Sequence, residues 1–225
     1  VMKNIGLIGC GNIAETYFRA QEYFNNINFV ACADINLDAA KKTAEQYNII
    51  PLSVDEILTD KNVDIILNLT IPQAHYEISK RALESNKHVY CEKPMSVKFD
   101  EAKELLNLAK KNSLYIGNAP DTFLGGGGQL TRNLIDNDDI GQILTGNFIF
   151  AFPGVQDFHP SPESWFQEGG GPVIDMGPYF FTTLVNLLGP VKNIRGRGAK
   201  FSEKREYKAG PKKGETFNVD IPTSY

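Results

Sequence analysis

The sequence predicts an α/β protein with a doubly wound parallel sheet at its N-terminus and an α+β domain after it. Through residue 118, short apolar runs alternate with segments of helical periodicity, which is the pattern of successive βαβ units. The first apolar run leads directly into a glycine-rich loop. Beyond residue 118, a glycine run and longer aromatic segments replace this alternation, so we expect two domains, residues 1–118 and 119–225.

The N-terminal elements follow from local periodicity and length. Apolar runs of strand length indicate strands at residues 3–8, 29–33, 64–69, 88–91 and 114–116. Between them we expect helices or helical turns at residues 12–23, 37–47, 54–58, 73–85 and 97–111. In the last helix, apolar side chains recur at three- and four-residue steps and are expected to face the core: Ala102, Leu105, Leu106 and Ala109.

The second domain is expected to combine helices with a more open sheet. Four glycines, residues 125–128, precede a predicted helix at residues 129–136. Strands are expected at residues 143–152, 191–197 and 217–221. The basic stretch 195–213 is interpreted as a solvated edge or loop. Because a sheet that stopped after the last predicted strand would leave an unpaired edge, we expect further C-terminal sequence to be missing.

Composition narrows the function classes. With 42% hydrophobic residues, 22% charged residues and a net charge of −4, the chain gives no reason to expect nucleic acid or an anionic membrane as a partner. Its three cysteines, Cys10, Cys32 and Cys91, are too widely spaced for a disulfide framework or a zinc site, which favours a reducing compartment. His75 and His88 lack metal-ligand spacing, and no apolar run approaches the roughly 18 residues of a membrane span. We expect a cytoplasmic protein without a metal.

The segment GCGNIA, residues 9–14, matches the dinucleotide-binding pattern G-x-G-x-x-G/A between a strand and a helix. Gly9 permits a tight turn, Gly11 lets the backbone approach a pyrophosphate, and Ala14 lets the helix pack closely on the sheet. We therefore expect a set of loop residues to bind the cofactor: Gly9, Cys10, Gly11, Asn12 and Ile13.

Two further positions are expected to line the cofactor site. Asp34 lies 20 residues after Ala14, at the end of the second strand, where a carboxylate binds an adenosine ribose diol and repels a 2′-phosphate. This favours NAD over NADP, although Asp34 can instead cap the following helix. Thr70 and Pro72 follow the strand at 64–69; they either line the cofactor cleft or only begin the next helix.

Glu92-Lys93-Pro94 ends the strand at 88–91, where doubly wound sheets bind their ligands. Pro94 restricts Lys93 to an extended backbone and can take a cis bond, so the direction of the lysine can be fixed. Lys93 is therefore a candidate proton-transfer group beside a bound cofactor. The alternative is a surface lysine in an ordinary turn between a strand and a helix.

The glycine loop, Asp34, KHVYCEKP at residues 87–94 and GGGPVIDMGPY at residues 169–179 together resemble the Gfo/Idh/MocA oxidoreductase family. The resemblance covers essentially the whole chain. It implies a Rossmann domain followed by an open-faced mixed sheet that commonly forms an oligomer interface, and hence a homo-oligomer. It also implies hydride transfer between a nicotinamide cofactor and a sugar, polyol or related carbinol. Members are usually longer, which again suggests missing C-terminal sequence.

Carried over to this chain, the resemblance makes Lys93 the catalytic lysine, with Glu92 beside it at the cofactor, and Asp175 the substrate-binding acid. Tyr179 stands where many members have a histidine, and a tyrosine there is a family variant that can act as acid or base. Spacing of four residues places Asp175 and Tyr179 on one helix face. The alternatives are a packed aromatic for Tyr179 and a capping or buried carboxylate for Asp175.

His159 and Trp165 are weaker candidates for substrate contact, because each can equally be a structural loop residue. Two other functions on the same scaffold remain open. One is an NAD-dependent glycosidase that returns its cofactor unchanged. The other is a non-catalytic, NAD-sensing regulator, against which the presence of Lys93 and Asp175 argues.

Overall fold

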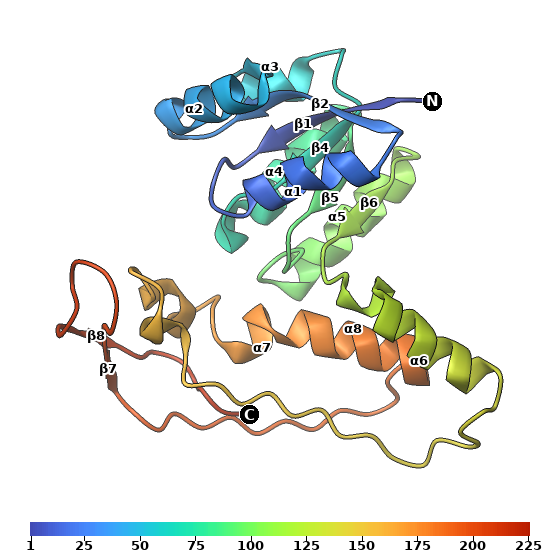
Figure 1. The fold of residues 1–225 in the computed structure, drawn as a ribbon, viewed down its shortest axis with the longest axis vertical. Coiled ribbons are helices and arrows are strands. Elements are labelled where there is room, and N and C mark those ends of the chain that lie inside the picture. Colours follow the sequence, from blue (N-terminus) through green and yellow to red (C-terminus); the bar gives the residue numbers. More distant parts are fainter. The chain divides into compact units, whose positions relative to one another are not determined.

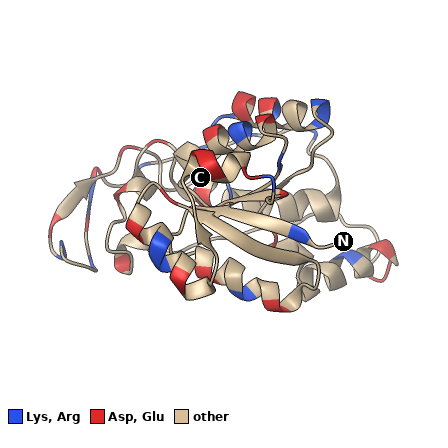
Figure 2. Cartoon of the chain, turned by 90° about the horizontal axis from the view of Figure 1, so that it is seen from above, with Lys and Arg blue, Asp and Glu red and all other residues tan.

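The computed structural model describes residues 1–225, which divide into two compact units, Val1–Ala119 and Pro120–Tyr225 (Figure 1). Charged residues of both signs are interspersed along the helices (Figure 2). No helix combines the length and the apolar character that crossing a lipid bilayer requires.

The first unit is built on a six-stranded sheet in the order β3-β2-β1-β4-β5-β6, with every neighbouring pair parallel. The strands are β1 Lys3–Ile8, β2 Ile27–Ala33, β3 Ile50–Pro51, β4 Ile65–Asn68, β5 His88–Cys91 and β6 Ile116–Asn118. The helices are α1 Ala14–Ala20, α2 Leu37–Tyr47, α3 Val54–Thr59, α4 Pro72–Glu84 and α5 Phe99–Lys111. The predicted doubly wound α/β fold is confirmed, since the strand order reverses between β1 and β4.

Two apolar clusters fill the two faces of this sheet. One cluster contains Ile57, Ile66 and Leu105 and packs against α3, α4 and α5. The other contains Leu7 and Phe18 and packs against α1 and α2. Because both faces are covered, the strands are apolar on both sides, which is why the sequence shows continuous apolar runs rather than strict alternation.

Several predicted bounds in this unit differ from the structure. Strand β3 was not predicted because it has only two residues. The helix expected at 12–23 begins at Ala14 and ends in a 3₁₀ turn, Gln21–Tyr23. The strand expected at 114–116 starts later, because the Leu114 N–H still closes the end of α5 by donating to Ala109 O at 2.8 Å. Leu106 is 51% exposed, so its expected core position was wrong.

The second unit contains 3₁₀ turns, three helices and a small antiparallel hairpin. Its 3₁₀ turns are η2 Thr122–Leu124, η3 Val155–Asp157 and η4 Glu163–Phe166. Its helices are α6 Gly126–Asp136, α7 Pro172–Asp175 and α8 Gly177–Leu188, and its strands are β7 Lys204–Glu206 and β8 Thr216–Asn218. The hairpin packs on η4 through a cluster of Phe166, Tyr207, Phe217 and Val219.

The second unit has the predicted α+β character, but its sheet is not the predicted one. Segments 143–152 and 191–197, predicted as strands, pair with no neighbour and run as irregular chain (Figure 1). A strand forms only where a second strand satisfies its backbone groups, so the expected mixed sheet is replaced by the two-stranded hairpin. Of the strand predicted at 217–221, only residues 217 and 218 belong to β8.

Three glycines of the run, residues 126–128, lie within α6 rather than before it, and Gly125 is its N-cap residue. A Cβ atom at Gly128 would lie 2.1 Å from the carbonyl oxygen of Phe123. The close approach of η2 therefore requires glycine at this helical position.

Candidate cofactor and catalytic site

The loop between β1 and α1 is shaped by Gly9. Its φ is +104°, and a Cβ atom there would lie 2.5 Å from the carbonyl oxygen of Leu69. Its N–H donates to Ala33 O at 2.9 Å, which closes the turn onto β2. In contrast, a Cβ atom on Gly11 would meet nothing within 4 Å. The loop thus leaves one side of Gly11 open, as close approach of a ligand to the backbone requires.

Asp34 joins this loop to the end of β2. Its Oδ2 accepts a hydrogen bond from Cys10 N–H at 2.7 Å, and its Oδ1 accepts from Asn36 N–H at 2.8 Å. The helix cap of α2 is Asn36, whose side chain accepts from the N–H groups of Asp38 and Ala39. The alternative role of Asp34 as the cap of α2 is therefore wrong.

The pKa values of the Cys10 and Cys32 thiols are shifted in opposite directions. A hydrogen bond from the fully buried Cys32 thiol lowers the pKa of the half-buried Cys10 thiol, while that bond and burial raise the pKa of Cys32. Burial raises the pKa of Cys91, at the end of β5, to about 12. Cys91 is thus a neutral, buried packing residue.

Thr70 and Pro72 follow β4 at the same edge. The Thr70 hydroxyl donates to Asn68 Oδ1 at 2.7 Å, and its N–H donates to the same oxygen at 3.2 Å. Pro72 is the first residue of α4, where its missing N–H costs nothing. Pro72 thus begins the helix, which is one of its two predicted roles. Binding of the cofactor by Thr70 and Pro72 stays a prediction.

The turn that carries Lys93 extends β5 beyond its last ladder position. The Glu92 N–H donates to Asn68 O at 2.9 Å, and the Lys93 N–H donates to Glu92 Oε2 at 3.0 Å. The Lys93–Pro94 peptide is cis.

Two residues that the sequence did not single out hold this turn. The Tyr17 hydroxyl, on α1, donates to Glu92 Oε1 at 2.8 Å. The Asn118 amide, at the end of β6, donates to the carbonyl oxygens of Cys91 and Glu92 at 2.9 and 3.0 Å. The only signal for them was position, since Tyr17 follows the glycine motif by one helical turn and Asn118 ends a strand of the same sheet. The turn is thereby tied to α1 and β6 as well as to β4.

Asp175 and Tyr179 belong to the second unit and to two successive helices. Asp175 ends α7, and its N–H donates to Gly171 O at 2.9 Å. Tyr179 lies in the first turn of α8, and Met176 joins the two helices. The expectation of one continuous helix carrying both side chains was therefore wrong. The N-cap residue of α8 is Met176 rather than Asp175.

Tyr179 is half-buried and lines a cavity of about 360 Å³ together with Thr122, Thr131, Phe148 and Phe180. A hydroxyl-bearing aromatic that faces a cavity differs from a fully packed core residue. Its interpretation as a merely packed aromatic is weakened by this position.

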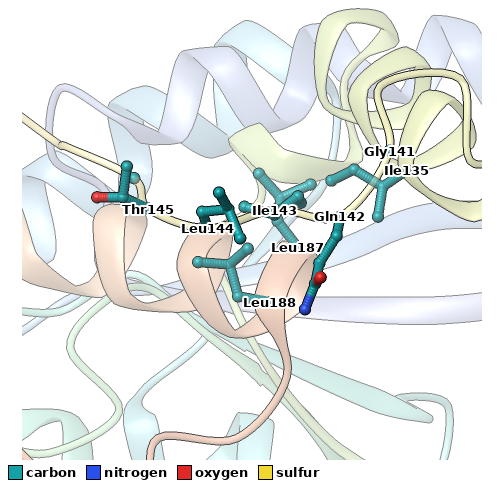
Figure 3. A pocket seen from close by; sticks show the side chains of 9 residues that line it. Ile135, Gly141, Gln142, Ile143, Leu144, Thr145, Leu187 and Leu188 are labelled. Atoms are coloured by element: carbon teal, nitrogen blue, oxygen red, sulfur yellow. The ribbon is translucent and has the colours of Figure 1, made fainter.

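His159 and Trp165 pack against each other, with ring centroids 4.6 Å apart. His159 Nδ1 accepts a hydrogen bond from Ser161 N–H at 3.0 Å, and Trp165 packs against the cluster beside η4. Both thus have structural roles within their loop. A second cavity, of about 420 Å³, lies between the C-terminal ends of α6 and α8 and contains none of the predicted site residues (Figure 3).

The structure thus gathers the glycine loop, Asp34, Thr70 and the Lys93 turn at the carboxyl edge of one parallel sheet. That arrangement defines the class of protein as one with a dinucleotide-binding domain of the Rossmann type. A profile described as "Oxidoreductase family, NAD-binding Rossmann fold" matches residues 3–118, and the GFO/IDH/MocA C-terminal domain matches residues 129–220. The chain belongs to the GFO/IDH/MocA oxidoreductase family.

Individual relatives share a low sequence identity with this chain. An uncharacterized oxidoreductase of Schizosaccharomyces pombe is 31% identical over 148 residues, which cover 64% of this chain and 39% of that protein. D-xylose dehydrogenase of Paenarthrobacter nicotinovorans is 27% identical over 177 residues, or 76% of this chain and 46% of the relative. A levoglucosan dehydrogenase solved with NADH and L-sorbose shares the fold, with a TM-score of 0.82 at 22% identity, over 98% of this chain and 61% of that one. The chain therefore spans about half the length of the relatives it matches.

Proposed function

We propose that the protein is an NAD(H)-dependent oxidoreductase that transfers a hydride between the nicotinamide and a sugar, polyol or related carbinol. The observation that carries this proposal is the Lys93 turn. It lies at the carboxyl edge that also presents the glycine loop and Asp34, and it is held there by bonds from α1 and β6. An ordinary surface lysine would not need its turn to be tied on both sides.

The residues at this edge fit a bound dinucleotide. The open side of Gly11 leaves room for a pyrophosphate against the loop backbone, and the Asp34 carboxylate suits a ribose diol. A carboxylate at that position disfavours a 2′-phosphate, which supports NAD over NADP. Cys10, Asn12, Ile13, Thr70 and Glu92 complete the proposed cofactor site.

Lys93, Tyr179 and Asp175 are the proposed catalytic residues. When bound, NAD supplies the acceptor for the hydride that leaves the carbinol carbon. The hydroxyl proton must leave at the same time, and we assign it to Lys93 Nζ or Tyr179 Oη in the unprotonated form, since only that form can accept it. Asp175 is assigned to hold the substrate hydroxyl groups. His159 and Trp165, which contact each other within their loop, are assigned to substrate contact.

The substrate class rests on the relatives. Those named act on D-xylose or levoglucosan, both of which are sugars or sugar anhydrides. A panel of sugars and polyols with NAD, read as net NADH formation, tests the proposal. Release of an aglycone from aryl glycosides without net NADH would instead indicate the glycosidase. NAD binding without turnover across the panel would indicate the regulator and contradict the proposal.

A further inference from the structure

His75 is a buried polar side chain at the carboxyl edge whose contacts reach the Lys93 turn. It lies in the second turn of α4 and is 1% exposed. Its Nδ1 lies 2.6 Å from the carbonyl oxygen of Pro94, and its Nε2 lies 2.9 Å from the carbonyl oxygen of Thr70. The imidazole ring therefore lies between the segment after β4 and the segment after β5.

The position of His75 is itself fixed by the buried end of β4. The side-chain amide of Asn68, which is fully buried, donates to His75 O and to Ser79 Oγ, each at 3.0 Å. The side-chain Oδ1 of Asn68 accepts hydrogen bonds from the hydroxyl and the N–H of Thr70. A buried polar group is costly unless it is hydrogen-bonded, so this set of bonds restricts the ring to one place.

The bond to Pro94 extends the connection between β4 and β5. The last backbone hydrogen bond between these strands is donated by the Glu92 N–H to Asn68 O. Pro94 has no N–H to offer, so its carbonyl oxygen is the backbone group by which this residue can be held. His75 Nδ1 contacts that oxygen one residue after Lys93.

The two ring contacts cannot be equivalent in a neutral ring. A carbonyl oxygen only accepts hydrogen bonds, and a neutral imidazole carries a single N–H. The contact with Pro94 is the shorter of the two. For the shorter contact to be a hydrogen bond, Nδ1 must be the nitrogen that carries the proton.

We propose that His75 is a positioning residue for the oxidoreductase reaction: its Nδ1–H holds Pro94 O and thereby fixes the Lys93 turn against the end of β4. The inference rests on the proposed role of Lys93 in proton transfer. It assigns His75 no contact with substrate or cofactor.

The first test uses the unmodified chain and needs no substrate. With 15N-labelled histidine, the three histidines are few enough to assign, and His75 is identified by the signals lost in His75→Asn. The expected result is a protonated, slowly exchanging Nδ1. A bare Nδ1 overturns the proposal.

The second test compares two amides that mimic the two ring nitrogens. The amide nitrogen of Asn occupies the place of Nδ1 and can bond Pro94 O, whereas that of Gln occupies the place of Nε2 and can bond Thr70 O. We expect His75→Gln to lower kcat at least tenfold more than His75→Asn, while KM for NAD changes less than threefold in both. Equal losses, or a larger loss in His75→Asn, overturn the proposal.

A third measurement separates this inference from the proposed function. In a 15N-lysine-labelled chain, the Lys93 amide signal is assigned by its loss in Lys93→Met, and Lys3, at the start of β1, serves as the internal control. We expect the Lys93 signal to shift in His75→Gln and to stay closer to its native position in His75→Asn. If Lys93→Met retains turnover, the proposed function fails, whereas an unmoved Lys93 signal in His75→Gln contradicts only the role of His75.

Discussion

At the scale of single residues, the β1–α1 loop depends on its two glycines for different reasons. Gly9 combines a positive φ with a carbonyl oxygen 2.5 Å from where a Cβ would lie, so glycine is required by the fold itself. A Cβ atom on Gly11 would meet nothing within 4 Å, so the fold does not require glycine there, and we expect only a bound ligand to require it.

This difference predicts opposite effects of two alanine substitutions. Gly9→Ala should lower the free energy of unfolding by about 2 kcal/mol or more, since it adds backbone strain and a steric clash. Gly11→Ala should leave that free energy within about 0.5 kcal/mol, as for surface changes, yet weaken NADH binding at least tenfold. Denaturant unfolding and NADH fluorescence titration measure the two quantities. Native stability in Gly9→Ala, or native NADH affinity in Gly11→Ala, would contradict this account of the loop.

At the scale of elements, the η4 turn is joined to the β7–β8 hairpin by an ionisable contact. The Tyr207 hydroxyl donates to Glu163 Oε1, and Lys212 Nζ lies 3.0 Å from the same oxygen. The hydrogen bond from Tyr207, with a smaller contribution from Lys212, lowers the pKa of Glu163 from 4.5 to about 2. Because the folded pKa is lowered, this contact stabilises the fold above pH 4.5, and the stabilisation is lost as the pH falls from 4.5 toward 2.

Tyr207→Phe should therefore make the stability of the second unit less dependent on pH between about 4.5 and 2, since the Glu163 pKa returns toward its ordinary value. The substitution keeps the aromatic ring in its cluster. Urea unfolding followed by the fluorescence of Trp165, the single tryptophan, reports on this unit. Lys212→Ala serves as the control and should have a smaller effect. An unchanged pH dependence in Tyr207→Phe would show that the bond does not set the Glu163 pKa.

The helices and strands of the first unit were predictable because the residues within and beside each element carry its local pattern. The bounds of β1, α2 and β5 agree with the sequence prediction, since turn residues flank each apolar or periodic run. Segment 143–152 has the same apolar, aromatic character but forms no strand, because pairing depends on a partner that its own sequence does not specify.

The same distinction applies to the site. Gly9, Asp34 and Lys93 could be placed at one edge because alternating strands and helices align the carboxyl ends of parallel strands. Tyr17, His75 and Asn118 were not recognised as partners of the Lys93 turn. Their bonds join residues 19 to 75 positions apart in the chain, and such pairs leave no local pattern.

At the scale of the whole molecule, the buried apolar residues are distributed unequally between the two units. Prolines and glycines aside, all but four lie in the first unit; the exceptions are Phe166, Tyr207, Phe217 and Val219. In the second unit, Leu144, Ile149 and Ile194 are 85%, 87% and 75% exposed. These three belong to the segments predicted as strands, so the apolar side chains that a sheet was expected to carry are exposed there.

We expect residues 1–119 alone to fold cooperatively and to bind NADH within about tenfold of the affinity of the whole chain. A unit of this size with two filled apolar clusters has its own core. Circular dichroism during thermal unfolding and NADH titration measure this. A non-cooperative transition, or loss of NADH binding, would show that the first unit is not an independent cofactor-binding domain.

The central claim is that Lys93 moves the proton in a hydride transfer, and Lys93→Met tests it most directly. Turnover of the carbinol found in the substrate panel, followed as NADH formation, should fall by about 10²- to 10⁴-fold, the usual contribution of a positioned acid or base. NADH binding should remain within a few-fold of native. Lys98→Met, which replaces an exposed lysine paired with Glu101, should keep native turnover. Native turnover in Lys93→Met would contradict the account.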